Sequence, residues 1–177
     1  MSTTTVKVWD LWVRLTHWTV AIGVFINLFE LTEEGSTWHE YVGYAVAGIV
    51  VSRLIWGFIG TKYARFSDFF PTPNRIKHHL QSIGSKGEKH LGHNPFGALM
   101  MFALWGVIIG LGVTGYMMGM DAYWGEEWLQ EGHELLANSL YVLIPLHILS
   151  AIGMGFVEKQ NLVKAMITGN KTVRRDY

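Results

Sequence analysis

The chain has 177 residues, of which 50% are hydrophobic and 16% are charged, and it has neither net charge nor cysteine. This length suits one domain, and the composition is unusual for a soluble enzyme. The absence of cysteine excludes disulfides, iron–sulfur clusters, thiolate metal sites and covalently attached haem. Any metal cofactor must therefore be held by histidine, methionine or carboxylate side chains.

Four long apolar segments predict membrane-spanning helices, each of which needs about 20 consecutive apolar residues. The third segment contains no charged residue, and the fourth contains only Glu134 near its start. Four buried helices of a soluble protein would leave too little polar surface to cover them. We therefore expect an all-α integral membrane protein with a four-helix transmembrane bundle in a single domain over residues 1–177. The expected helices cover about residues 9–31, 38–60, 96–120 and 133–157.

The connecting segments differ in charge. Lys and Arg outside the helices lie near the N-terminus, in the segment 61–93 and in the C-terminal tail, whereas the other two loops are acidic. Because short cytoplasmic loops carry the excess of Lys and Arg, we expect both termini and the segment 61–93 in the cytoplasm. Residues 74–83 predict a short interfacial helix, and residues 161–168 a weaker one. The acidic outer loops would attract a positively charged redox protein, although solvated loop ends explain them equally well.

The eight histidines form two groups. Ionisable residues at membrane depth are costly and usually functional, so the histidines of the spanning helices are the stronger candidates for a site. One such residue alone could be a hydrogen-bonded core histidine, but four are harder to explain in that way. The helix group is His17, His39, His133 and His147, and the cytoplasmic group is His78, His79, His90 and His93.

Spacing and topology sort the helix group into two pairs. His133 and His147 are fourteen residues apart, which is nearly four turns and about 21 Å along one helix face. One metal ion cannot bind both, but two haems at different depths can each take one. With the N-terminus inside, His39 pairs with His133 near the outer surface, and His17 pairs with His147 nearer the cytoplasm. Two imidazoles fill both axial positions of a haem iron, which favours electron transfer over oxygen chemistry.

Two arginines lie near the expected inner haem. Arg53 follows His39 by fourteen residues, and Arg14 precedes His17 by one turn. Either guanidinium could bind a haem propionate through charge-assisted hydrogen bonds. Anchoring to the lipid headgroups is the simpler explanation for Arg14 and an equal alternative for Arg53.

The chain resembles the bacterial cytochrome b561 family and the b-type cytochrome subunits of membrane nickel–iron hydrogenases. The resemblance covers nearly the whole chain. It is carried by VWDLWVRLTHW, WHEYVGYAVAG, SRLIWGFIGTKYARFSDF, LGHNPFGALMM, GHELLAN with LHIL fourteen residues after it, and NLVKAMITG.

This resemblance implies a dihaem inner-membrane cytochrome that relays electrons between the quinone pool and a periplasmic partner. The family's ligand positions fall on His17, His39, His133 and His147. Relatives work with hydrogenases, formate or thiosulfate enzymes or c-type cytochromes, and one branch oxidises superoxide unaided. Short outer loops favour an electron-transfer subunit over a stand-alone oxidoreductase, and their acidity favours a soluble c-type cytochrome. His93 in LGHNP is either part of a quinone site or simply next to a helix cap at Asn94.

Two other classes of function compete with this interpretation. A histidine-lined metal transporter or membrane metalloenzyme could use His39 and His133 with the neighbouring glutamates, but it leaves His17 and His147 unexplained and lacks H-E-x-x-H spacing. A structural anchor for a soluble enzyme predicts a colourless protein. No nucleic-acid signature is present, and the sequence leaves homodimer formation open.

Overall fold

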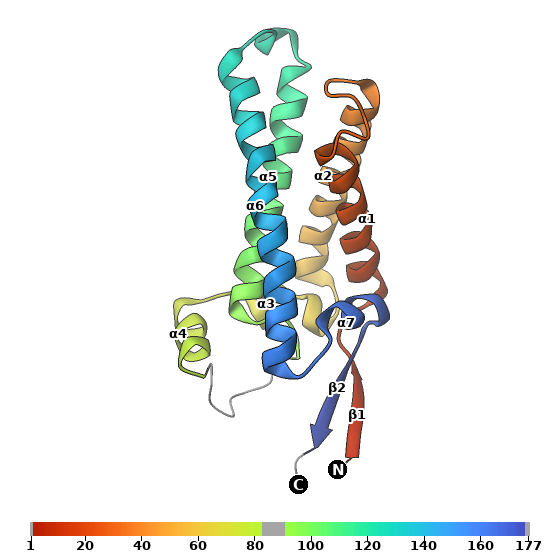
Figure 1. Ribbon diagram of the computed structural model, residues 1–177, viewed down its shortest axis with the longest axis vertical. Coiled ribbons are helices and arrows are strands. Elements are labelled where there is room, and N and C mark those ends of the chain that lie inside the picture. Colours follow the sequence, from red (N-terminus) through yellow and green to blue (C-terminus); the bar gives the residue numbers. More distant parts are fainter. Residues whose placement is uncertain (1, 83–90, 176–177) are drawn as a thin grey trace. The chain divides into compact units, whose positions relative to one another are not determined.

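A computed structural model describes residues 2–82 and 91–175 of the chain. Four long helices dominate it, joined by short helices and bounded by one strand at each end (Figure 1). The last residue of the expected interfacial helix, Ile83, and His90 of the cytoplasmic group lie outside the described part. The elements are β1 (Ser2–Lys7), α1 (Leu11–Leu28), α2 (Thr37–Ile59), η1 (Lys62–Ala64), α3 (Phe66–Phe69), α4 (Pro73–Ser82), α5 (Pro95–Met118), η2 (Asp121–Tyr123), α6 (Glu127–Glu158), α7 (Leu162–Thr168) and β2 (Asn170–Arg175).

In the described residues, α1, α2, α5 and α6 are long and apolar enough to cross a membrane. They coincide with the four predicted segments and confirm the helical membrane class. The start of the last helix was wrong, since α6 begins at Glu127 and not near residue 133. Gly125 has a φ of 77°, which ends the preceding turn, and the acidic Glu127 in the first turn complements the helix dipole. The first turns of α6 were not predicted because they are polar and so lie outside the apolar run from which the helix was inferred.

The chain divides into two compact units, and the sequence of every long helix contributes to both. The first unit comprises Met1–Arg14, Trp56–Met101 and Leu146–Tyr177, and the second comprises Leu15–Ile55 and Phe102–Pro145. The prediction of a single domain over residues 1–177 stays a prediction.

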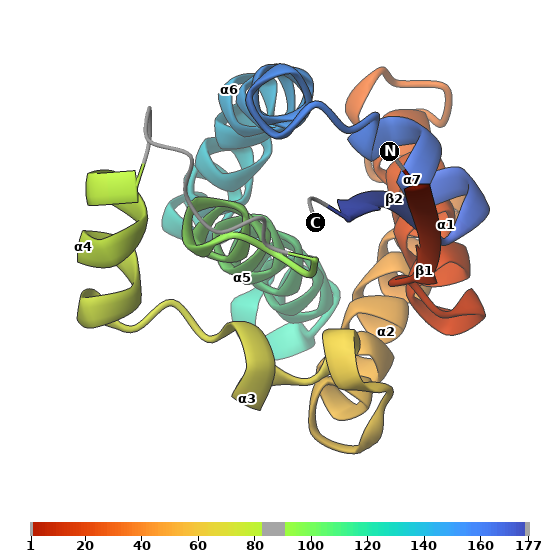
Figure 2. The same ribbon diagram turned by 90° about the horizontal axis from the view of Figure 1, so that it is seen from below.

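A two-stranded ribbon in the first unit joins the two ends of the chain. Strands β1 and β2 pair antiparallel, in register from Ser2 opposite Arg175 to Lys7 opposite Asn170. Figures 1 and 2 show the two strands next to each other. Gly169 connects α7 to this ribbon with a φ of 83°, and its carbonyl accepts the N–H groups of Val8 and Trp9. A Cβ at Gly169 would lie 2.6 Å from the Trp9 carbonyl oxygen, so only glycine fits. The pairing brings the two ends of the described chain together.

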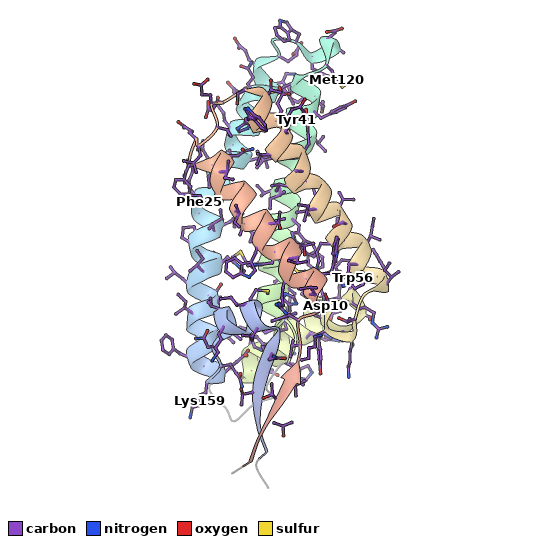
Figure 3. The ribbon with its side chains drawn as sticks, turned by 90° about the vertical axis from the view of Figure 1, so that its right-hand side faces the viewer. Asp10, Phe25, Tyr41, Trp56, Met120 and Lys159 are labelled. Atoms are coloured by element: carbon purple, nitrogen blue, oxygen red, sulfur yellow. The ribbon has the colours of Figure 1, made fainter. Side chains whose placement is uncertain are left out.

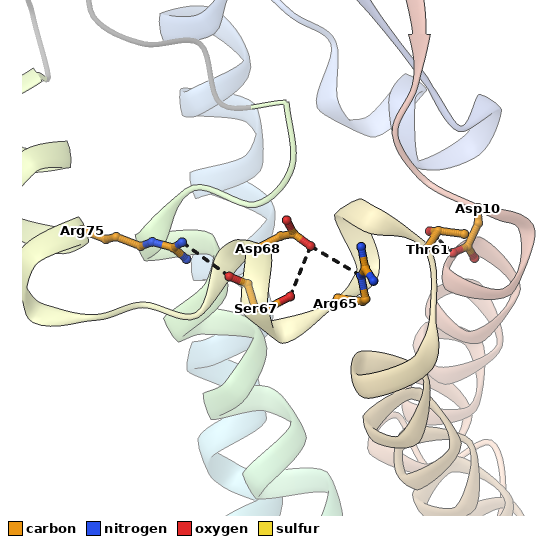
Figure 4. A network of polar contacts seen from close by, with 6 residues as sticks. All are labelled: Asp10, Thr61, Arg65, Ser67, Asp68 and Arg75. Carbon is orange, nitrogen blue, oxygen red and sulfur yellow. Dashed lines mark hydrogen bonds and ion pairs between the residues drawn. The ribbon is translucent and has the colours of Figure 1, made fainter.

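The carboxylate of Asp10 connects three segments of the first unit. One oxygen, Oδ1, accepts the backbone N–H of Val13 at 2.8 Å and so caps α1. The other, Oδ2, accepts the indole Nε1–H of Trp56 at 3.0 Å and the hydroxyl of Thr61 at 2.6 Å. Figure 3 labels Asp10 close to Trp56, and Figure 4 shows its contact with Thr61. Asp10 thus ties the start of α1 to the end of α2.

Polar contacts also order the segment after α2. Arg65 lies 3.7 Å from the Asp68 carboxylate, and Arg75 donates to the Ser67 carbonyl at 3.5 Å (Figure 4). The nearby core of the first unit consists of Val8, Trp9, Val13, Ala64 and Ala165.

Helices approach each other closely in the second unit because small residues lie at the contacts. Val46, Val50 and Ile108 form its buried core. A Cβ added to Gly112 of α5 would lie 2.7 Å from the Cβ of Ala47 in α2, and one added to Gly110 would lie 3.0 Å from Leu136 in α6. This is the small-residue packing that membrane helices use.

Candidate functional site

Two imidazoles from different helices face each other in the second unit. His39 lies in the first turn of α2 and His133 near the start of α6, and their ring centroids are 6.4 Å apart with an angle of 57° between the planes. Two imidazoles on opposite sides of one metal ion have centroids roughly 6 Å apart, because each metal–nitrogen bond is about 2 Å long and each centroid lies about 1 Å farther out. The pair therefore fits two axial ligands of one iron.

The ring of His133 is held by a hydroxyl from α5. Thr114 Oγ1 lies 2.8 Å from His133 Nδ1. An imidazole whose Nδ1–H is bound in this way presents the lone pair of Nε2 to a metal. Beside it, a Cβ added to Gly115 would lie 3.6 Å from the Cε1 atom of His133. The surroundings of His133 thus suit a metal-ligating histidine.

The backbone of His39 is held by hydrogen bonds on both sides, whereas its ring nitrogen Nδ1 is not. Its N–H donates to Ser36 Oγ at 3.3 Å, and its carbonyl accepts from the amide of Asn27 at 2.9 Å. Asn27 in turn accepts the hydroxyl of Thr32 at 3.1 Å. The ring nitrogen Nδ1 of His39 is buried and has no hydrogen-bond partner among the described residues. An orphaned buried nitrogen opposite a second imidazole is consistent with a site that a bound cofactor completes.

Arg53 is buried in the second unit, with only 5% of its surface exposed. Its guanidinium carbon lies 5.4 Å from the ring centroid of Trp105, a cation–π contact. This burial does not fit an arginine that reaches toward lipid headgroups. Its predicted role as a propionate partner stays a prediction.

Arg14 has a structural contact in the first unit. Its guanidinium Nη1 donates to the carbonyl of Thr168 at 3.4 Å, next to Gly169. The contact ties α1 to the end of α7. The binding of a propionate by Arg14 likewise stays a prediction.

The other two predicted ligands lie in different units. His17 belongs to α1 in the second unit and meets the ring of Trp18 edge-on at 5.1 Å. His147 belongs to α6 in the first unit, two residues after Pro145, and its carbonyl accepts the hydroxyl of Ser150 at 3.0 Å. Their pairing with each other remains a prediction.

His93 lies between two aromatic rings in the first unit. The ring centroid of Trp9 is 4.6 Å away and that of Phe69 is 4.8 Å away. Asn94 caps α5 by accepting the N–H of Gly97 at 2.7 Å. The predicted helix cap at Asn94 is thereby confirmed. A cavity of 310 Å³ lies alongside His93, and a quinone site there stays a prediction. The cavity is lined by Lys62, Tyr63, Asp68, Phe69, Leu91, Gly92 and His93.

Two contributors to the site were not anticipated from the sequence, namely Thr114 and Asn27. Thr114 is far from His133 in the sequence, and Asn27 is far from His39. The only feature of the sequence that could have drawn attention to Thr114 is its hydroxyl in a largely apolar helix. Within the described residues, no group of three His, Asp or Glu side chains could hold a metal ion.

The four apolar helices define a multi-pass helical membrane protein, and two imidazoles from different helices lie close together within it. The chain belongs to the prokaryotic cytochrome b561 family, whose model matches residues 8–169. It is therefore a b-type cytochrome of electron transport, and its cofactor is haem b.

Curated relatives span nearly the whole chain. It is 23% identical to a probable Ni/Fe-hydrogenase B-type cytochrome subunit of Azotobacter vinelandii, over 98% of this chain and 91% of the relative. It is also 23% identical to a protein of the same name from Rhodobacter capsulatus, over 98% of this chain and 84% of the relative. No solved structure gives a significant match.

Proposed function

We propose that this cytochrome carries electrons across the bacterial inner membrane through two haems b, one of them held by His39 and His133. The observation that supports this proposal most directly is the 6.4 Å separation of the two imidazole centroids. Bound between two imidazoles, haem b supplies a one-electron iron couple. His39 and His133 would hold the iron between them and so would keep oxygen and other small ligands away from the metal.

The second haem is proposed to lie between His17 and His147, nearer the cytoplasm. This pairing rests on spacing, since His147 follows His133 by fourteen residues on one helix, close to four full turns. Arg53 would supply a buried positive charge for a propionate at that level. The orientation rests on the basic residues of both termini and of the segment 61–93, and the β1–β2 pairing supports a common side for the two ends.

The electron donor on the outer side is proposed to be a hydrogenase-like enzyme, and the acceptor is quinone. The names of the relatives favour a hydrogenase. The acidic loops with Glu33, Glu34, Asp121 and Glu126 would also suit a basic c-type cytochrome. Membranes that contain the cytochrome and a nickel–iron hydrogenase should show haem reduction under hydrogen, followed by reoxidation on addition of quinone. Reduction by a c-type cytochrome alone would favour the second partner, and reduction by superoxide alone would favour a stand-alone oxidoreductase.

The ligand set is tested by counting haem in four single variants, His17→Ala, His39→Ala, His133→Ala and His147→Ala. We expect two extractable haems in the wild type and one in each variant, with the same reduced-minus-oxidised component missing within each pair. His78→Ala is the matched control, because this histidine is exposed on α4. A colourless wild-type protein from haem-sufficient cells would overturn the proposal and favour a structural anchor or a metal site.

A further inference from the structure

Thr114 lies where α5 contacts α6. One turn before it, Gly110 is so close to Leu136 that an added Cβ would lie 3.0 Å from a Leu136 methyl group. Leu136 follows His133 by three residues, so the two contacts are successive steps along one helix–helix interface. The packing at this interface places the Thr114 hydroxyl next to the His133 ring.

The hydroxyl has other acceptors for its own proton. Thr114 Oγ1 lies 2.9 Å from the carbonyl oxygen of Gly110 and 3.2 Å from that of Leu111. Threonine in a helix commonly donates to such carbonyls. A lone pair of Oγ1 is then free to accept a hydrogen bond from the Nδ1–H of His133, with 2.8 Å between the two atoms. In this arrangement Nδ1 carries the proton of the neutral ring, and Nε2 keeps the lone pair that a metal requires.

We propose that Thr114 is a positioning residue for the outer haem, which holds His133 in the metal-ligating tautomer and sets the basicity of its ring. This inference rests on the proposed function, because it requires His133 to be an axial ligand. Partners of a ligating histidine fix its orientation and raise its basicity, and their loss typically weakens metal binding by about 10–100-fold. A more basic imidazole stabilises ferric iron, so Thr114 lowers the reduction potential of the outer haem.

The two ligands of this haem are thereby unequal. His133 has a fixed ring, whereas the Nδ1 atom of His39 has no hydrogen-bond partner among the described residues. The support from Thr114 consequently acts on one side of the haem only, and a single variant can remove it.

The test compares Thr114→Val, which keeps the shape and loses the hydroxyl, with Thr114→Ser, which keeps the hydroxyl. Ser139→Ala is the control, because the Ser139 hydroxyl donates to the Leu136 carbonyl at 2.6 Å within the same unit. Three properties are measured: haem retention in dilution series, the midpoint potential of each haem, and the electron paramagnetic resonance spectrum of the ferric protein.

In Thr114→Val we expect the outer haem to bind on the order of 10–100-fold more weakly, with a raised potential and an altered ferric spectrum. The inner haem should be retained, which shows that the variant folds, and Thr114→Ser and Ser139→Ala should resemble the wild type. An unchanged outer potential and affinity in Thr114→Val would overturn the inference, and so would equal loss of both haems. Retention of the outer haem in His133→Ala would instead overturn the ligand assignment itself.

Discussion

Gly112 of α5 and Ala47 of α2 are so close that a Cβ on Gly112 would lie 2.7 Å from the Cβ of Ala47. A Cβ atom cannot move without its backbone, so Gly112→Ala should push α2 and α5 apart. We expect the variant to lose about 1–3 kcal/mol of stability. It should also bind the proposed outer haem less completely, since α2 carries the proposed ligand His39. Thermal denaturation in detergent, followed by haem absorbance, measures both effects. Gly106→Ala in the same helix is the control, because its added Cβ has no neighbour within 4 Å. Equal stability of the two variants would contradict the prediction.

Replacing Arg53 by Met should lower the midpoint potential of one haem. A buried positive charge favours the reduced state, which carries one positive charge fewer, and the low dielectric of the interior strengthens this effect. Arg53→Lys keeps the charge over Trp105 and should shift the potential less. Redox titration of both variants decides the matter. An unchanged potential in Arg53→Met would show that Arg53 serves packing against Trp105 only.

Asp10→Asn should destabilise the first unit by about 1–3 kcal/mol. In Asp10→Asn one of the two oxygens becomes an amide nitrogen, which cannot accept a hydrogen bond. The variant therefore loses either the bond from the Val13 N–H or the bonds from Trp56 and Thr61. Asp68→Asn is the matched control, because its contact with Arg65 is exposed and such pairs contribute about 0–1 kcal/mol. Urea or thermal unfolding would separate the two, and equal losses would count against the role assigned to Asp10.

The buried ammonium group of Lys171 should make the stability of the protein depend on pH in the alkaline range. Burial lowers the pKa of its ammonium group below the ordinary 10.5, and Glu158, 3.7 Å away, offsets only part of this effect. Between the lowered pKa and 10.5 the unfolded chain binds more protons than the folded one, so stability rises with pH. The wild type should therefore gain stability relative to Lys171→Met as pH rises from neutral toward 10.5. A flat or falling difference would contradict the prediction.

The spanning helices could be predicted because their signal is local: each is a run of apolar residues long enough to cross a membrane. The start of α6 could not be predicted in this way, because its first turn, with Glu127, is polar. This start also follows the positive φ of Gly125, which a run of apolar residues does not reveal. The ribbon was also missed. Strands β1 and β2 are short and polar and lie at opposite ends of the chain, so their pairing depends on the fold that brings them together.

The closeness of His39 and His133 agrees with the pairing predicted from topology and spacing, because depth in a membrane is set by position along a helix. Their role as haem ligands stays a prediction. The hydroxyl of Thr114 could not be assigned to His133, since this contact depends on the rotation of α5 against α6. The burial of His79 is a second feature that could not be predicted from the sequence. The sequence placed this residue in a charged cytoplasmic segment, whereas its ring is buried beside Phe96 at 5.6 Å.

The pairing of β1 with β2 also limits when this ribbon can form during synthesis of the chain. Strand β1 leaves the ribosome first, but its partner strand follows all four long helices in the sequence. The ribbon can therefore close only after the last helix has been synthesised. Residues Ser2–Lys7 must wait on their side of the membrane without a partner until then, so a chain that stalls before Asn170 would leave β1 unpaired and accessible to proteases.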